Sequence, residues 1–187
     1  MVAIINYIGN IGSVKNALDY LEIPNFIADK PDDLEKATHI IIPGVGNWSE
    51  GAKKLKPFYK YLKSTNKPIL GICLGYQLLC NSSEEGSGKG VGLIDAEVKD
   101  IGFQHVGWEY VLGKSFYFVH RYGVKSNTDG RFISMYSDKN ITGLQMHPEK
   151  SQTDGLAFIK EWYEANNSSF AIERWSHCEV GAVYQNS

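Results

Sequence analysis

The segment K-P-I-L-G-I-C-L-G-Y-Q-L-L, residues 67–79, decides the fold class of this 187-residue chain. Residues 68–72 form a short apolar run, which predicts a strand buried on both of its faces. Residues 74–82 then carry apolar side chains at helical spacing. A buried strand that turns directly into a helix is typical of an α/β protein, and Cys73 stands at this turn.

The same alternation of strand and helix continues on both sides of this segment. The first half is expected to contain strands at residues 2–8, 25–28 and 38–42 and helices at residues 14–21, 32–37 and 49–63. Ser13 is expected to cap the first of these helices. The second half is β-rich, with expected strands at residues 93–101, 105–112, 115–124, 131–136 and 141–146 and a closing helix at residues 153–165.

Strands that alternate with helices predict a mostly parallel central sheet covered by helices on both faces. Ligands of such sheets bind beyond the carboxyl ends of the strands, so the loops that follow the strands are the informative ones. Residues 1–166 are expected to form one domain, because domains average about 150 residues. Residues 167–187 have no clear hydrophobic period and are left unassigned.

Composition excludes several classes of function. With 43% hydrophobic and 21% charged residues, the chain has the composition of a globular protein. Its 19 Lys and Arg against 21 Asp and Glu give a net charge of −2, so no overall positive field exists to attract nucleic acid or an anionic membrane. Neither a signal peptide nor an apolar run of about 20 residues is visible, so we expect a cytoplasmic protein without a membrane partner.

Of the three cysteines, Cys73 is the one whose flanking sequence indicates a catalytic role. The three cysteines are odd in number and irregularly spaced, which indicates neither a disulfide framework nor a metal site. Gly71 and Gly75 flank Cys73 in a G-x-C-x-G sequence, the cysteine version of a nucleophile elbow. The following helix N-terminus would favour the thiolate, and the Leu74 amide would face an oxyanion. A small buried cysteine at a strand end would have the same local sequence.

A second apolar run, residues 141–146, leads to His147 and then Glu149. His147 is suited to exchange a proton with a thiol nucleophile, and Glu149 to orient the imidazole, which is the division of labour in nucleophilic triads. The sequence Pro-Gly-Val-Gly at residues 43–46 would supply a second oxyanion donor. Taken alone, the His147 motif also fits a hydrogen-bonded structural histidine, and the Pro-Gly-Val-Gly sequence also fits an ordinary turn.

These residues resemble the class I (triad-type) glutamine amidotransferases, most nearly the glutaminase subunits of imidazole glycerol phosphate synthase, over residues 1–165. The cysteine and histidine motifs are shared by the whole class, and the others are more particular to these subunits. The motifs read G-S-V at 12–14, P-G-V-G-N at 43–47, G-I-C-L-G-Y-Q-L-L at 71–79, S-E-E-G at 83–86, H-V-G-W at 105–108, F-Y-F-V-H at 116–120 and H-P-E-K-S-Q at 147–152.

The resemblance implies a flavodoxin-like three-layer α/β/α sandwich and hydrolysis of glutamine to glutamate and ammonia, without a cofactor. The Cys73 thiol would form a glutamyl thioester, assisted by His147 and Glu149. The remaining roles that the resemblance implies are an oxyanion hole at Val45, Gly46 and Leu74, and substrate binding by Gln77 and Glu85. In this family the ammonia passes to a (β/α)₈-barrel synthase subunit that makes imidazole glycerol phosphate in histidine biosynthesis. The two chains would form a heterodimer, with His105 and Trp108 facing the barrel.

The chain departs from the family pattern in several places. Gln104 and Glu109 flank the H-V-G-W motif, where the family usually has Pro and Asn. Arg121, followed by Tyr122, stands beside the expected glutamine pocket, where the family usually has a small hydroxyl residue, and both are expected to bind substrate. The loops are also shorter than is usual in the family, and the tail after Asn166 matches nothing in it. A compact, divergent member of this kind suits a paralogue that feeds ammonia to sugar amidination in bacterial surface-polysaccharide synthesis. The same scaffold and triad would equally serve a γ-glutamyl hydrolase or a cysteine peptidase, and the fold alone would serve a non-catalytic partner-binding subunit.

Overall fold

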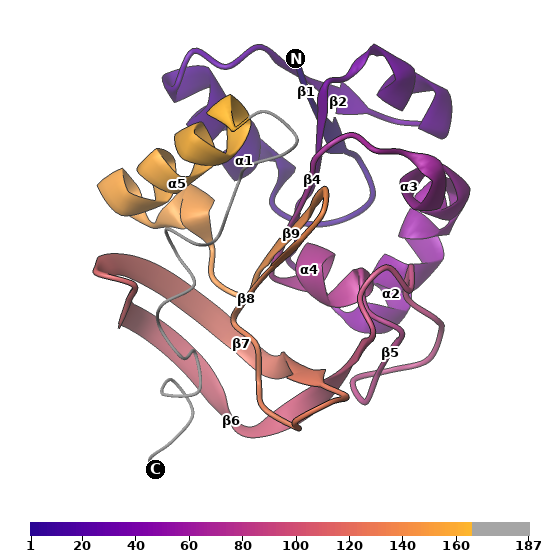
Figure 1. The fold of residues 1–187 in the computed structure, drawn as a ribbon, viewed down its shortest axis with the longest axis vertical. Helices are drawn as coiled ribbons and strands as arrows, with labels where there is room; N and C mark the ends of the chain where they lie inside the picture. Colours follow the sequence, from indigo (N-terminus) through magenta and orange to yellow (C-terminus); the bar gives the residue numbers. More distant parts are fainter. Residues whose placement is uncertain (166–187) are drawn as a thin grey trace.

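The computed structural model describes residues 1–165, which build a central six-stranded sheet with the order β2-β1-β3-β4-β9-β8 (Figure 1). Five strands are parallel, and the edge strand β8 is antiparallel to β9. The unassigned stretch 167–187 lies outside the described residues. The strands of this sheet are β1 (Val2–Ile5), β2 (Asn25–Ala28), β3 (His39–Ile42), β4 (Ile69–Ile72), β8 (Met135–Asp138) and β9 (Ile141–Leu144).

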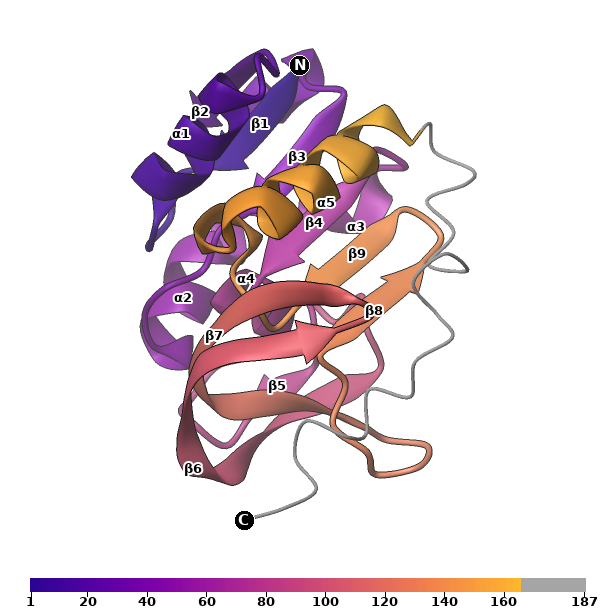
Figure 2. The same cartoon turned by 90° about the vertical axis from the view of Figure 1, so that its left-hand side faces the viewer.

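Helices cover both faces of this sheet, because alternate side chains of each buried strand point to opposite sides. Ile40 and Ile42 belong to the core under α2 (Trp48–Leu55) and α3 (Tyr59–Ser64). Ile41 belongs to the core under α1 (Ile11–Tyr20) and α5 (Gln152–Glu164), which lie together on the other face (Figure 2). The predicted three-layer α/β/α sandwich with a mostly parallel sheet is therefore confirmed.

A second, three-stranded sheet lies beyond the carboxyl ends of the parallel strands (Figure 2). It consists of β5 (Ser82–Ser83), β6 (Ala96–Val111) and β7 (Lys114–Ser126). The separate strands expected at residues 93–101 and 105–112 are wrong, because β6 is one strand whose register shifts between Asp100 and His105. A bulge of this kind bends a strand without ending its pairing, so the hairpin curves over the main sheet.

Three local expectations about helices are also wrong. The helix expected at residues 49–63 is split into α2, the 3₁₀ turn η2 (Lys56–Phe58) and α3, because Pro57 cannot donate a backbone hydrogen bond. Helix α1 begins at Ile11, so Ser13 lies inside it rather than at its cap. Helix α4 (Leu74–Leu78) ends well before residue 82, where β5 begins. The remaining short turns are η1 (Pro31–Lys36) and η3 (Pro148–Lys150).

Residues 1–165 hold neither a membrane-spanning helix nor a cluster of metal ligands. None of the helices in this range is long and apolar enough to cross a membrane. No three His, Cys, Asp or Glu side chains in this part of the chain gather closely enough to hold a metal ion.

Candidate active site

Cys73 occupies a sharp turn between β4 and α4. Its backbone has φ +48° and ψ −108°, a conformation that costs a non-glycine residue about 1–3 kcal/mol and is typical of functional sites. The Cys73 amide donates to the Leu144 carbonyl at 2.6 Å, which joins the turn to the end of the neighbouring strand. Gly75 is required beside it, because a Cβ atom there would lie 2.0 Å from the Ile42 carbonyl oxygen. The turn therefore has the form expected of a nucleophile elbow.

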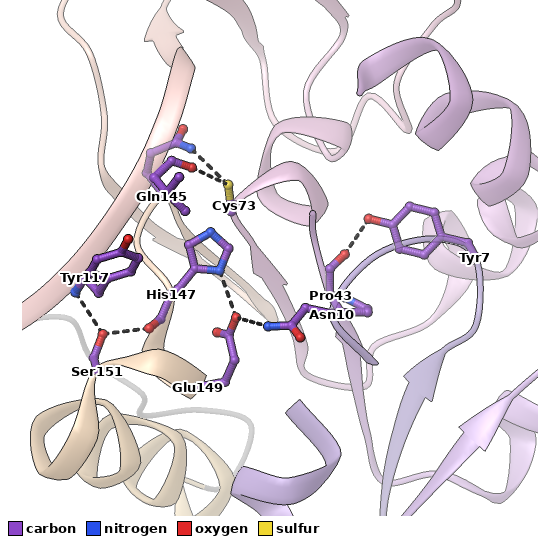
Figure 3. Close-up of polar contacts among 10 residues, drawn as sticks. Tyr7, Asn10, Pro43, Cys73, Tyr117, Gln145, His147, Glu149 and Ser151 are labelled. Atoms are coloured by element: carbon purple, nitrogen blue, oxygen red, sulfur yellow. Dashed lines mark hydrogen bonds and ion pairs between the residues drawn. The ribbon is translucent and has the colours of Figure 1, made fainter. Parts of the chain in front are cut away.

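His147 and Glu149 lie next to this turn because β4 and β9 are parallel neighbours. Ile72 pairs with Leu144, so the residues that follow the two strands meet at the same edge of the sheet. The His147 side chain is 1% exposed, and its Nδ1 lies 2.8 Å from Glu149 Oε1. The imidazole lies between the Cys73 sulfur and the carboxylate (Figure 3).

The backbone of His147 is held by β7 and by Ser151. The His147 amide donates to the Tyr117 carbonyl at 2.9 Å. The His147 carbonyl accepts from Ser151 Oγ at 2.6 Å, as Figure 3 shows. Ser151 Oγ in turn accepts from the Tyr117 amide at 3.0 Å. The hairpin over the main sheet therefore fixes the base against the nucleophile.

The electrostatics of the three groups favour a charged imidazole. Burial alone lowers the pKa of His147, but interactions with Cys73 and Glu149 outweigh it and raise this pKa to about 10. The second ring nitrogen, Nε2, has no hydrogen-bond partner within residues 1–165. A protonated His147 is suited to stabilise a thiolate and to give a proton to a leaving amine.

Asn10 joins the carboxylate from the turn after β1. Its side-chain amide donates to Glu149 Oε1 at 3.1 Å, the same oxygen that faces His147 (Figure 3). Sequence reasoning missed Asn10, although a Gly-Asn turn at the carboxyl edge of a parallel strand is where a ligand-facing residue is expected. Asn10 therefore limits the orientations that the buried Glu149 side chain can take.

The predicted oxyanion residues lie against the elbow. Gly44 touches it so closely that a Cβ atom there would lie 2.6 Å from the Leu74 nitrogen. The preceding carbonyl, that of Pro43, accepts a hydrogen bond from the Tyr7 hydroxyl, which anchors the loop. Leu74 is the first residue of α4, where backbone amides have no partner within the helix. Val45, Gly46 and Leu74 line one cavity with Cys73 and His147.

This cavity has a volume of about 440 Å³, within the usual range for small-molecule sites. The four predicted substrate-binding residues also line it: Gln77, Glu85, Arg121 and Tyr122. Burial raises the pKa of Glu85, against the opposing effect of the Trp48 amide, which donates to Glu85 Oε2 at 3.0 Å. The Arg121 guanidinium is half-exposed and pairs with Asp100 at 2.9 Å, so its charge is partly neutralised at the cavity rim.

The two predicted interface residues lie in different surroundings on β6. His105 is buried, stacks on Phe118 and places its Nε2 3.1 Å from Glu109 Oε1. Trp108 is 47% exposed and shares an outward face of the hairpin with the exposed Val106 and Tyr110. Trp108 is therefore open to solvent on this hairpin, whereas His105 is buried beneath the same strand.

Comparison with known proteins bears on the identity of this site. Residues 3–164 match the family model described as glutamine amidotransferase class-I. This chain belongs to that family. An imidazole glycerol phosphate synthase subunit HisH 2 from Methanococcus maripaludis is 37% identical, and the match covers 87% of this chain and 98% of the relative. The corresponding subunit HisH of Pyrococcus furiosus is 36% identical, with 83% of this chain and 93% of the relative covered.

Solved structures of other glutamine amidotransferases share the fold of this family member. A crystal structure described as glutamine amidotransferase gives a TM-score of 0.70 at 19% identity, covering 87% of this chain and 97% of that one. The glutaminase domain of Trypanosoma brucei CTPS with bound acivicin gives 0.60 at 15% identity, covering 88% and 94%. At these identities the likeness establishes the fold alone.

Proposed function

We propose that this protein is the glutaminase subunit of an imidazole glycerol phosphate synthase, acting in the cytoplasm in histidine biosynthesis. One observation carries the proposal: His147 lies buried between the elbow residue Cys73 and the carboxylate of Glu149, at a cavity of about 440 Å³. The relatives at 36–37% identity, which are named as subunits of this synthase, support the choice within the family.

The reaction follows from the three side chains. The Cys73 sulfur attacks the side-chain amide carbon of glutamine, which forms a C–S bond and a tetrahedral oxyanion held by amides of residues 45, 46 and 74. The His147 imidazolium gives its proton to the amide nitrogen, the C–N bond breaks, and ammonia leaves behind a glutamyl thioester. Neutral His147 then takes a proton from water, whose oxygen attacks the thioester. The C–S bond breaks, glutamate leaves, and Cys73 and His147 return to their starting state.

The ammonia passes to a separate (β/α)₈-barrel synthase subunit in a heterodimer. The exposed apolar residues of β6, Val106, Trp108 and Tyr110, support this assignment, because apolar and aromatic side chains exposed together are typical of interfaces. The hairpin that presents them also fixes His147 through Tyr117. Partner binding and catalysis therefore share one structural element.

The proposal is tested by assaying this chain with and without the barrel subunit from the same organism. We expect glutamine hydrolysis that rises on addition of the barrel, and imidazole glycerol phosphate formed with glutamine as the nitrogen source. Cleavage of γ-glutamyl peptides without partner-dependent ammonia release would instead identify a γ-glutamyl hydrolase or peptidase. A Cys73→Ser variant that still supports product formation from glutamine would identify a non-catalytic subunit.

One observation favours a second acceptor for the ammonia. Glu109, at a position where the resembled family usually has Asn, is 3.1 Å from His105 on the face of β6 opposite Trp108, and its side chain is 43% exposed. A carboxylate at this edge of the hairpin suits a different barrel, such as one that amidinates a sugar in surface-polysaccharide synthesis. The barrel that co-purifies with this chain, and the product that it forms, discriminate between the two acceptors.

A further inference from the structure

Gln145 is a buried polar residue that the mechanism above does not use. It follows β9 and precedes His147 by two residues, and its exposed fraction is 0%. Its side-chain Nε2 lies 3.7 Å from the Cys73 sulfur (Figure 3). Its backbone amide donates to the Ser134 carbonyl at 2.8 Å, so the residue is fixed at both ends.

The orientation of the Gln145 amide is determined by a chain of hydrogen bonds. The Tyr122 carbonyl can only accept, so the Gln77 atom 2.7 Å from it must be the amide nitrogen. The same Gln77 nitrogen lies 3.3 Å from Gln145, which must therefore present its oxygen. The Gln145 nitrogen is left to face Cys73. The Tyr122 carbonyl is itself positioned by His120 Nδ1 at 2.9 Å.

Of the two polar groups beside the Cys73 sulfur, one is a hydrogen-bond acceptor and the other is a donor. The Val119 carbonyl, 3.9 Å from the Cys73 sulfur, accepts a hydrogen bond from a thiol and repels a thiolate. The Gln145 N–H does the opposite, because it donates to the charged sulfur. Gln145 therefore offsets Val119 when Cys73 loses its proton.

We propose that Gln145 is a positioning residue for the nucleophile: its N–H directs and stabilises the Cys73 thiolate, and Gln77 fixes the amide in the donating orientation. The inference rests on the proposed function, since it concerns the thiol that attacks glutamine. It assigns Gln77 a second task besides substrate binding. It also links the cavity wall at Tyr122 to the sulfur through two side chains.

The test is the pH dependence of Cys73 alkylation by iodoacetamide in the full chain, carrying Cys178→Ser so that this second thiol does not react. Cys80 is fully buried, and burial raises its pKa far above the ordinary value, so it stays unreactive. Gln145→Met keeps the length of the side chain and removes the N–H. We expect the midpoint of its alkylation profile to rise by about 1 pH unit and kcat/KM for glutamine to fall about 10-fold.

A matched control separates this effect from general damage to the strand. Thr142→Val alters another buried polar residue of β9 and is expected to leave the alkylation midpoint unchanged. Gln77→Met leaves Gln145 in place but removes the N–H that holds the Gln145 oxygen, without adding a charge, so the Gln145 amide is free to turn and the midpoint should again rise. This variant carries the test if Gln145→Met does not fold.

Equal midpoints in Gln145→Met, Thr142→Val and the parent would overturn the inference. So would a raised midpoint in Gln145→Met with no change in Gln77→Met, because the amide orientation would then have no role. The alkylation uses no glutamine. A parent protein that alkylates as expected but hydrolyses no glutamine would therefore contradict the proposed function and leave the role of Gln145 intact.

Discussion

Replacing Gly75 by alanine is expected to distort the elbow and destabilise the fold around it. The added Cβ would lie 2.0 Å from the Ile42 carbonyl oxygen and 3.0 Å from that of Pro43, whereas real Cβ atoms essentially never come within 3.0 Å of another heavy atom. The end of β3 and the start of α4 must therefore separate by about 1 Å, against packing that is fixed on both sides. We expect a loss of at least about 3 kcal/mol in the free energy of unfolding.

Urea denaturation followed by circular dichroism measures this loss, and glutaminase assays measure the accompanying fall in kcat/KM. A misplacement of about 1 Å at the nucleophile is expected to reduce kcat/KM about 100-fold. Gly12→Ala is the matched control, because a Cβ atom there meets nothing within 4 Å and the residue lies inside α1. It should leave activity unchanged and stabilise the protein by up to about 1 kcal/mol. A Gly75→Ala protein as stable and active as the parent would show that the elbow accommodates a Cβ atom at this position.

Three further substitutions test individual contacts of the site. Glu149→Gln should lower kcat/KM at least about 100-fold. It should also bring the pKa of His147 down from about 10, because burial, which disfavours the imidazolium, is then no longer offset by the carboxylate; NMR titration of the histidine measures this pKa. Asn10→Ala should reduce kcat/KM about 10-fold by freeing Glu149, with the KM for glutamine unchanged in steady-state assays. Burial, with smaller contributions from neighbouring histidines, lowers the pKa of His120 to about 4. Between pH 6.5 and 4 the unfolded chain therefore takes up a proton at this residue that the folded state does not, and the folded state loses stability as the pH falls through this range. In His120→Gln this loss in the free energy of unfolding, about 1 kcal/mol per pH unit, should be absent. Urea titrations at several pH values measure it, and the same dependence of the free energy of unfolding on pH in both proteins would contradict this expectation.

The nucleophile and the base could be predicted from sequence because each follows an apolar strand. Cys73 has glycines on both sides, and His147 has a carboxylate two residues later, and both patterns are local. Their closeness depends on the pairing of β4 with β9, which are separated by the whole β6–β7 hairpin in sequence. Periodicity shows that two strands exist but not that they are neighbours. Only the resemblance to a family predicts that pairing.

Asn10 and Gln145 escape sequence reasoning for different physical reasons. Asn10 is a single polar residue in a turn, and nothing local says that Glu149 will lie 3.1 Å away. Gln145 falls inside a run that is otherwise apolar, where the pattern predicts only a strand. Its role depends on Gln77 and Tyr122, which tertiary packing brings together from distant parts of the chain.

The second sheet is visible as β-rich sequence, but its separation from the main sheet is not. Every second residue of β6 from Val106 to Tyr110 is exposed, a pattern that predicts a half-buried strand in either sheet. The bulge after Asp100 includes Gly102 at φ +89°, and in the sequence it looks like a break between two strands. Glycine permits both outcomes, so the choice is made by tertiary packing.

Glutamine hydrolysis at this site proceeds through a covalent thioester on Cys73, which peptide mapping after an acid quench detects. The protein is mixed with isotopically labelled glutamine, quenched during turnover and digested. We expect labelled glutamyl on the peptide that contains Cys73, none in Cys73→Ser, and glutamate release at least about 1000-fold slower in that variant. Glutamate formed at the same rate by Cys73→Ser, or label on another residue, would contradict it.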